Sequence, residues 1–218
     1  MQPNGAAAFN VSGDAYDRFM GRYSRPLAVE FATFADIDEA ALRVLDVGCG
    51  PGALTAELVR RVGASSVLAC DPSPSFVAAC AARNPGVEVR SGTAEQVPFD
   101  DDSVDAAVAQ LVLHFVSDPP AAAAELGRVV RSGGIIAACV WDFDEGMEML
   151  RTFWDAALQV DPDAPDEARV LRFGRPGELS AWLSAGGFTD VVVKTPAAAS
   201  TYTGFEELWA GFQHGIGP

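Results

Sequence analysis

The strongest constraint on the fold is a glycine-rich turn that directly follows an apolar run. The sequence reads VLDVGCGPG from Val44 to Gly52. The apolar run is typical of a buried parallel strand, and glycines in the spacing G-x-G-x-G let the backbone approach a nucleotide at the start of the next helix. The segment therefore predicts a strand, a nucleotide-binding turn and a helix.

The same alternation continues along most of the chain and predicts the fold class. Strand-like apolar runs alternate with helical stretches, which is typical of a doubly wound, Rossmann-like α/β fold whose mostly parallel sheet has helices on both faces. Strands are expected at residues 43–47, 66–70, 87–90, 104–109, 135–141 and 188–194, and helices at residues 53–62, 74–82 and 121–130.

The domain organisation follows from length and local composition. With 218 residues the chain is long enough for one complete hydrophobic core, and we expect a single domain over residues 14–218. Residues 1–13 are polar and lack periodicity, so a disordered tail is expected there. The alternation lapses over residues 142–187, which predicts an insert between strands five and six.

Charge and cysteine usage exclude several classes of function. The net charge of −15 would repel nucleic acid and anionic lipid surfaces, so we expect neither as a partner. The four cysteines show no metal-ligand or redox spacing, which favours free thiols in a reducing cytoplasm. The acidic run at residues 100–102 is interpreted as a solvated turn, and no metal is expected.

Two aspartates bear on the cofactor that the glycines could hold, and one of them, Asp46, discriminates between the candidates. The run that starts at Gly48 fits both a dinucleotide fingerprint and a tighter turn. A diphosphate at the following helix N-terminus would be repelled by Asp46, whereas S-adenosylmethionine carries an ammonium and a sulfonium and no phosphate. Asp71 ends the second strand, where a carboxylate can accept both ribose hydroxyls of either nucleotide. Asp46 therefore favours S-adenosylmethionine over NAD, whereas Asp71 supports a nucleoside without distinguishing the two.

Four segments in order resemble a known family. They are VLDVGCGPGALT at 44–55, CDPSPSFV at 70–77, GTAEQVPFDDDSVDAAVAQLVLHFV at 92–116 and ELGRVVRSGG at 125–134. Together they resemble class I S-adenosylmethionine-dependent methyltransferases of the small-molecule branch, methyltransferase type 11, similar to those of ubiquinone and menaquinone biosynthesis. The resemblance covers roughly residues 16–134. It implies methyl transfer to a small molecule by in-line displacement, with S-adenosylhomocysteine as the product.

The resemblance also implies a set of cofactor-binding residues. They are Gly48, Cys49 and Gly50 at the amino-acid part and ribose, Asp71 at the ribose, Pro72, Ser73, Ala94 and Glu95 around the adenine, and Gln110 beside the methionine part. Thr93 stands where the family often has an aspartate that accepts from the adenine amino group. A hydroxyl is a weaker acceptor than a carboxylate, so Thr93 is expected to contribute less.

The segment YDRFMGRYSRP at residues 16–26 resembles an N-terminal lid. By this resemblance residues 14–40 form helices over the cofactor, Arg22 pairs with its carboxylate, and Tyr16 closes over its methionine end. The alternative is an exposed amphipathic helix with solvated arginines. The family's fold also closes with an antiparallel last strand, but after residue 194 only a helix and a loop are predicted. Either the chain stops before this strand, which we expect, or the sheet ends unusually; in both cases the final strand is missing.

Methyl transfer from a sulfonium mainly needs an oriented nucleophile and the exclusion of water. No catalytic residue is strictly required. His114, just after the fourth strand, is the candidate general base, with a packed core histidine as the alternative, and His214 is a weaker candidate. Three aromatic residues either line an acceptor pocket or belong to the core, namely Trp154, Phe173 and Trp182.

Two other functions stay open at this point. A methyltransferase-like protein could bind the nucleoside without turnover, because binding needs only the glycines and Asp71. An NAD(P)-dependent oxidoreductase is disfavoured by Asp46. It is also disfavoured because the sole lysine, Lys194, is not part of a persuasive Tyr-x-x-x-Lys pair.

Overall fold

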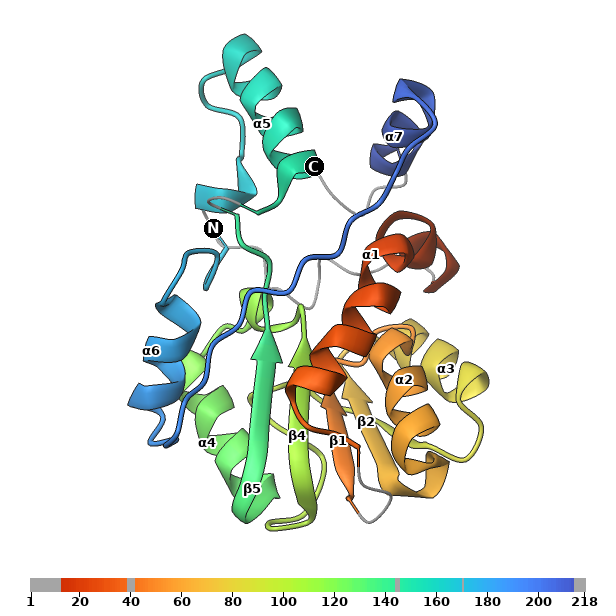
Figure 1. Cartoon of the computed structure of the whole chain (residues 1–218), viewed down its shortest axis with the longest axis vertical. Helices are drawn as coiled ribbons and strands as arrows, with labels where there is room; N and C mark the ends of the chain where they lie inside the picture. Colours follow the sequence, from red (N-terminus) through yellow and green to blue (C-terminus); the bar gives the residue numbers. More distant parts are fainter. Residues whose placement is uncertain (1–12, 39–41, 144–145, 170, 214–218) are drawn as a thin grey trace.

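The computed structural model describes residues 13–38, 42–143, 146–169 and 171–213. Except for Gly13, the predicted N-terminal tail lies outside the described residues, and so does His214. Within the described ranges the chain forms one parallel sheet covered by helices (Figure 1).

The described sheet has five parallel strands in the order β3-β2-β1-β4-β5. The strands are β1 Val44–Val47, β2 Val67–Asp71, β3 Glu88–Ser91, β4 Val104–Gln110 and β5 Val130–Cys139. The strand order reverses between β1 and β4, and ligands of such sheets bind outside the carboxyl ends of the strands at this point. The predicted Rossmann-like α/β class is confirmed, with a site expected after β1, β2 and β4.

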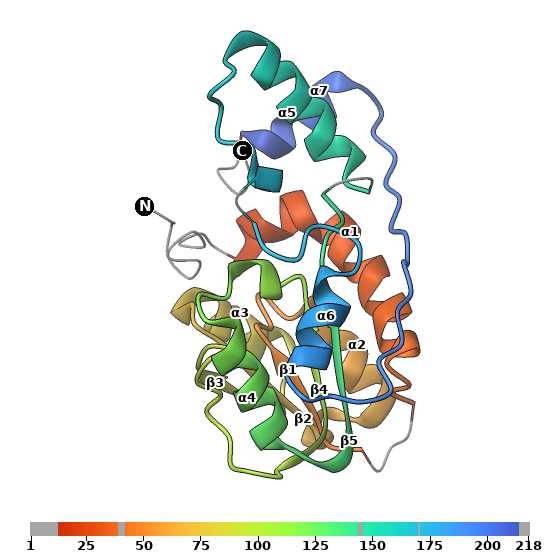
Figure 2. The same cartoon turned by 90° about the vertical axis from the view of Figure 1, so that its left-hand side faces the viewer.

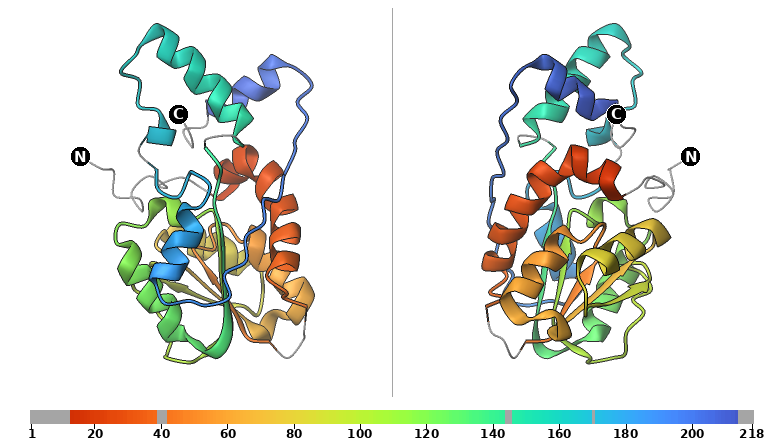
Figure 3. Two further views of the ribbon diagram at one scale, coloured as in Figure 1. Left: turned by 60° about the vertical axis from the view of Figure 1, so that its left-hand side comes forward. Right: turned by 90° about the vertical axis from the view of Figure 1, so that its right-hand side faces the viewer.

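The helices form two layers and a cap. Those on one face of the sheet are α1 Gly13–Phe34, α2 Ala53–Val62 and α3 Pro74–Arg83 (Figure 3). Those on the other face are α4 Pro119–Val129 and α6 Glu178–Ala185. The cap beyond the carboxyl ends of the strands consists of α5 Glu148–Val160 and α7 Phe205–Phe212 (Figure 2). Single turns of 3₁₀ helix are η2 Ala64–Ser66, η3 Leu113–Phe115 and η4 Glu167–Arg169.

The two faces of the sheet have separate cores. Val44 packs with Phe31 of α1 and Leu58 of α2, whereas Leu45 packs with Leu126 of α4. Successive strand residues point to opposite faces, so a strand that is buried on both sides reads as a continuous apolar run. This explains why β1 is apolar except at one position, Asp46.

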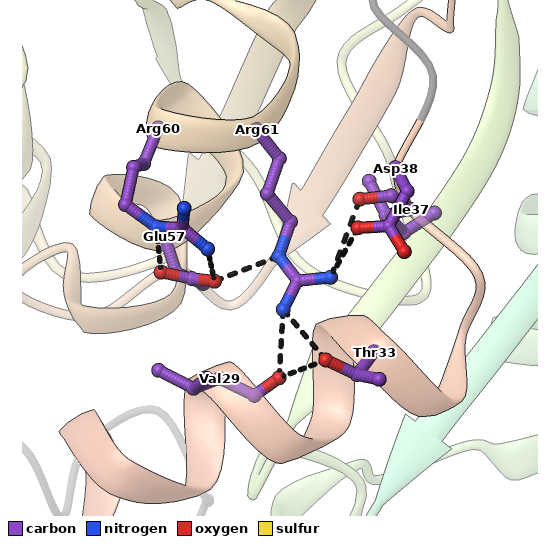
Figure 4. A network of polar contacts seen from close by, with 7 residues as sticks. All are labelled: Val29, Thr33, Ile37, Asp38, Glu57, Arg60 and Arg61. Carbon is purple, nitrogen blue, oxygen red and sulfur yellow. Dashed lines mark hydrogen bonds and ion pairs between the residues drawn. The ribbon is translucent and has the colours of Figure 1, made fainter.

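Arg61 of α2 anchors α1 to the domain (Figure 4). Its side chain is only 5% exposed, and it donates to the Glu57 carboxylate at 2.7 Å and to Asp38 at 2.7 Å. It also donates to the Val29 carbonyl oxygen at 2.9 Å and the Thr33 hydroxyl at 2.7 Å, near the end of α1. This buried guanidinium therefore fixes the helix that runs across the carboxyl edge of the sheet.

The strand expected at residues 188–194 is wrong. No strand follows β5 within the described residues, and this segment is irregular. Val192 and Val193 are 73% and 69% exposed. β-branched residues favour a strand only where a neighbouring strand supplies hydrogen bonds and packing, and the segment pairs with none in the described chain. The residues 142–187 therefore cannot be described as an insert between two strands.

The structure also shows the state of the cysteines and the length of the apolar helices. All four cysteines are free, and Cys49, Cys70 and Cys80 are buried. No helix in the described ranges is long and apolar enough to cross a membrane.

Candidate cofactor site at the carboxyl ends of the strands

The turn after β1 contains three glycines with positive φ. Gly48, Gly50 and Gly52 have φ values of +71°, +52° and +97°. A Cβ atom at Gly48 would lie 2.4 Å from the Val112 side chain, and one at Gly52 would lie 2.5 Å from that of Asn84. At Gly50 a Cβ would meet nothing within 4 Å. Packing therefore explains two glycines, whereas the bare backbone at Gly50 faces open space.

Asp71 ties the end of β2 to this turn. One carboxylate oxygen accepts from the Gly50 N–H at 2.9 Å, and the other accepts from the Ser73 N–H at 2.8 Å. Burial raises the pKa of Asp71, although both hydrogen bonds favour the charged form. Pro72 and Ser73 follow directly, and the Ser73 hydroxyl shares a hydrogen bond with that of Ser75 at 2.9 Å. A buried carboxylate thus lies beside the open face of Gly50.

Asp46 lies beneath the turn and not in the open. It is 1% exposed and accepts from the Thr55 hydroxyl of α2 at 2.6 Å. Burial raises the pKa of Asp46 to about 7, against the hydrogen bond from Thr55, which lowers it. The argument that this carboxylate repels a diphosphate is weaker for a buried, partly neutral group. Its contact with the cofactor stays a prediction, and Asp71 becomes the better evidence. Thr55 had no recognisable signal in the sequence.

The pKa of Asp46 predicts how stability depends on pH. The folded chain holds this proton up to about pH 7, whereas the unfolded chain loses it near the usual pKa of an aspartate. The free energy of unfolding therefore falls as pH rises from that usual pKa to about 7. Asp46→Asn removes the ionisation and keeps an acceptor for Thr55. In urea unfolding without ligand, we expect the variant's stability relative to the parent to grow by on the order of 2 kcal/mol between pH 5 and pH 8. Parallel pH profiles would contradict a buried acid.

The loop after β3 lies against Asp71. The Gly92 N–H donates to the Asp71 carbonyl oxygen at 3.2 Å, and Thr93 and Gln96 close a tight turn. Ala94 is buried. Glu95 accepts from the Ser117 N–H at 2.7 Å and its hydroxyl at 3.0 Å. Burial works against the charge of Glu95, but these bonds hold its pKa below the usual value. The Glu95 carboxylate is therefore engaged before α4, so only its other atoms are free to cover an adenine.

Gln110 leaves a buried polar atom without a partner at the end of β4. Its side-chain nitrogen donates to the Ser24 carbonyl oxygen of α1 at 3.0 Å. Its Oε1 atom and the Ser24 hydroxyl are both buried and have no hydrogen-bond partner in the described part of the chain. Buried polar atoms are normally satisfied, so such an atom indicates a polar group that belongs there. That the methionine part of S-adenosylmethionine supplies this group stays a prediction.

Tyr16 places the start of α1 over the same edge. Its ring contacts the Phe76 ring of α3 edge-on, with 5.5 Å between centroids. Burial raises the pKa of Tyr16 to about 12, with smaller contributions from the charges of Asp17 and Asp71. The structure therefore brings Tyr16 of α1 close to Asp71 and the glycine turn.

Known proteins are similar to this chain in sequence. Residues 45–138 match the family model of a methyltransferase domain. An uncharacterized methyltransferase of Mycobacterium tuberculosis is 38% identical over 135 residues, which are 62% of this chain and 52% of that protein. The chloroplastic 2-methyl-6-phytyl-1,4-hydroquinone methyltransferase 2 of Oryza sativa subsp. japonica is 31% identical over 162 residues, 73% of this chain and 42% of that protein. The chain spans about half the length of these curated relatives.

A solved structure agrees with the sequence matches. An S-adenosylmethionine-dependent methyltransferase from Thermotoga maritima is 25% identical, superposes with a TM-score of 0.53, and covers 81% of both chains. In sequence and in fold the chain is similar to class I S-adenosylmethionine-dependent methyltransferases. The family resemblance seen in the sequence is thereby confirmed, although the likeness does not require a quinone-biosynthesis branch.

Arg22 has partners other than a cofactor. Its guanidinium donates to Glu207 of α7 at 2.6 Å and lies 4.1 Å from the centroid of the Tyr202 ring. The hydrogen bonds to Tyr202 and Glu207 raise the pKa of Arg22. The structure thus joins α1 to the C-terminal segment through this residue. A role of Arg22 at the cofactor carboxylate stays a prediction that must compete with this ion pair.

Both ring nitrogens of His114 have hydrogen-bond partners. Its Nε2 atom accepts from the Trp141 N–H at 2.7 Å, so Nδ1 carries the proton and donates to the Arg172 carbonyl oxygen at 2.6 Å. His114 is buried, and burial lowers its pKa to about 4, against the bond to Arg172. The geometry supports the packed core histidine over the general base, because the ring ties β5 to the loop before α6.

Packing is the main role of Cys49 and of most of the aromatic residues that were candidates for an acceptor pocket. The hydrogen bond to Cys80 and burial raise the pKa of Cys49, so its thiol stays protonated. Trp154 donates to Glu167 at 3.3 Å and Trp182 to the Pro119 carbonyl oxygen at 2.9 Å, and both indoles are buried in the core. Phe173 alone of the three aromatic candidates lines a cavity at the cap.

Proposed function

We propose that the chain binds S-adenosylmethionine at the turn after β1 and transfers its methyl group to a small molecule. The observation that carries this proposal is the Asp71 carboxylate, which is buried beside the open backbone of Gly50. Carboxylates in this position accept ribose hydroxyls. The unpartnered Oε1 atom of Gln110 supports a polar cofactor group after β4.

Each part of the site has a role in this proposal. When bound, the cofactor supplies a methyl group that is activated by its sulfonium. Asp71 holds the ribose, Pro72, Ser73, Thr93 and Ala94 border the base, and Gln110 orients the amino-acid part. We propose that α1 acts as a lid that excludes water, since Ser24 and Tyr16 already cover this edge. Of the described residues between 142 and 187, α5 belongs to the cap, whereas α6 covers one face of the sheet.

A small acceptor is supported by charge and by one relative. The net charge of −15 disfavours nucleic acid as a substrate. The matched rice protein is named for a hydroquinone that carries a phytyl chain. In-line displacement from a sulfonium needs no dedicated base, which agrees with the engaged nitrogens of His114.

The experiment compares two glycine variants by titration calorimetry. S-adenosylhomocysteine is expected to bind the parent chain, whereas NADH is not. Gly50→Ala places a methyl group in the open space and should weaken the binding of S-adenosylhomocysteine by about tenfold or more. Gly133→Ala is the matched control, because Gly133 also has positive φ and an open Cβ position but lies at the start of β5.

A turnover assay then separates an enzyme from a binding protein. We expect S-adenosylhomocysteine to accumulate from S-adenosylmethionine in the presence of an acceptor panel, with Gly133→Ala active and Gly50→Ala impaired. NADH binding, or equal behaviour of the two glycine variants, would refute the proposed function.

A further inference from the structure

A cavity of about 650 Å³ lies next to the proposed cofactor site. It is lined by residues of α1, the end of β5, the start of α5 and the segment over residues 193–202. Its floor includes Cys139, and Cys139 pairs in register with Gln110 on β4. A volume of this size holds a small organic ligand, and the floor is one strand away from the expected methionine end.

The walls of this cavity are largely apolar. Aliphatic, thioether and aromatic side chains dominate, namely Met20, Leu27, Trp141, Met147, Phe173 and Leu208. The charged residues in the lining balance, because Asp142 and Glu148 stand against Arg175 and Lys194. A phosphorylated or carboxylated acceptor would need an excess of positive charge, so this lining suits an uncharged molecule.

Two tyrosines form a polar point in the cavity. The hydroxyls of Tyr23 and Tyr202 lie 2.7 Å apart, and Met149 Sδ lies 3.3 Å from the Tyr202 hydroxyl and 3.6 Å from that of Tyr23. One proton joins the two hydroxyls, and the other points to the sulfur. Arg22 also bonds to Tyr202, so the open acceptor is the Tyr23 oxygen. When the Tyr23 hydroxyl donates to that of Tyr202, the Tyr23 oxygen accepts no proton from within this group and can accept one from a ligand.

Both rings are held in place. The Tyr23 ring contacts Trp141 edge-on with 6.3 Å between centroids, and Tyr202 lies under the Arg22 guanidinium. Arg22 is in turn bound to Glu207 of α7. The ion pair that takes Arg22 from the cofactor thus orders the wall of the cavity. A fixed acceptor in an apolar pocket selects a ligand by its hydroxyl group.

We propose that this cavity is the acceptor site and takes an uncharged, largely apolar molecule with a hydroxyl group, of the alkylphenol or alkylhydroquinone class. The proposal rests on the proposed function, because only a methyl donor after β4 makes the cavity an acceptor site. The hydroxyl donates to the tyrosine pair, and the alkyl part packs on Leu27, Trp141 and Phe173.

The test uses 4-butylphenol and its methyl ether, 4-butylanisole, as probes in titration calorimetry with the full chain. The parent should bind the phenol about fivefold more tightly than the ether, as expected for one neutral hydrogen bond. The double variant Tyr23→Phe/Tyr202→Phe keeps both rings and removes both hydroxyls. It should bind the two probes equally.

A blocking variant tests the location. Ala198 lines the cavity and lies in an irregular segment, so Ala198→Trp should fill the cavity with the new indole. The binding of both probes should weaken at least about tenfold. Ala82→Trp, exposed on α3 outside the cavity, should behave as the parent. Undiminished probe binding in Ala198→Trp, no saturable binding to the parent, or a hydroxyl preference that survives the double variant would overturn the proposal. S-adenosylhomocysteine is titrated separately, so its failure to bind would count against the proposed function, whereas the probe titrations judge the cavity.

Discussion

Asp71→Ala is expected to weaken the binding of S-adenosylhomocysteine by about 100-fold or more, measured by titration calorimetry. Two charge-assisted hydrogen bonds to the ribose hydroxyls contribute roughly 1.5–3 kcal/mol each when a buried carboxylate accepts them. The same change removes the acceptor of the Gly50 N–H, so the turn is loosened as well. Both effects act in the same direction.

Glu88→Ala is the matched control for this prediction. It also removes a carboxylate, but Glu88 lies at the amino end of β3, away from the carboxyl ends of the strands. There it is exposed and paired with Arg90. The control should retain the parent's affinity. Equal affinities of the Asp71 and Glu88 variants, with both folded by circular dichroism, would remove Asp71 from the site.

Arg61→Ala is expected to lower the free energy of unfolding by roughly 3 kcal/mol, because it breaks a buried ion-pair network and removes the donor that joins α2 to the Val29 carbonyl oxygen and the Thr33 hydroxyl of α1. Urea unfolding measures this change. Arg60→Ala is the matched control, since Arg60 contacts the same Glu57 but is 65% exposed, and exposed pairs contribute little. Similar losses for both variants would show that Arg61 does not anchor α1.

The sheet could be predicted from sequence because burial makes its signal local. β1 and β4 are covered on both faces, so most of their residues are apolar, and the glycine turn marks the end of β1. The observed ends of β1, β2 and β3 lie within two residues of the predicted ones. The expected strand at 188–194 failed because its apolar residues have no neighbouring strand, and partner availability is not written in the segment itself.

The site was predicted less completely because several of its partners are distant in sequence. The bonds from Thr55 to Asp46 and from Gln110 to Ser24 join separate elements, as does the ion pair of Arg22 with Glu207. Sequence spacing showed which residue types stand at strand ends, but not which neighbour each one contacts. Asp71 was accessible to prediction because the end of a parallel strand fixes its place.

The central claim is that the open backbone of Gly50 and the Asp71 carboxylate hold an adenosyl cofactor. A crystal structure of the full chain with S-adenosylhomocysteine tests it most directly. The account predicts density for the ribose hydroxyls on Asp71, with the methionine part near Gln110. Density for the nucleoside at any other place, with Asp71 still bonded only to Gly50 and Ser73, would contradict it.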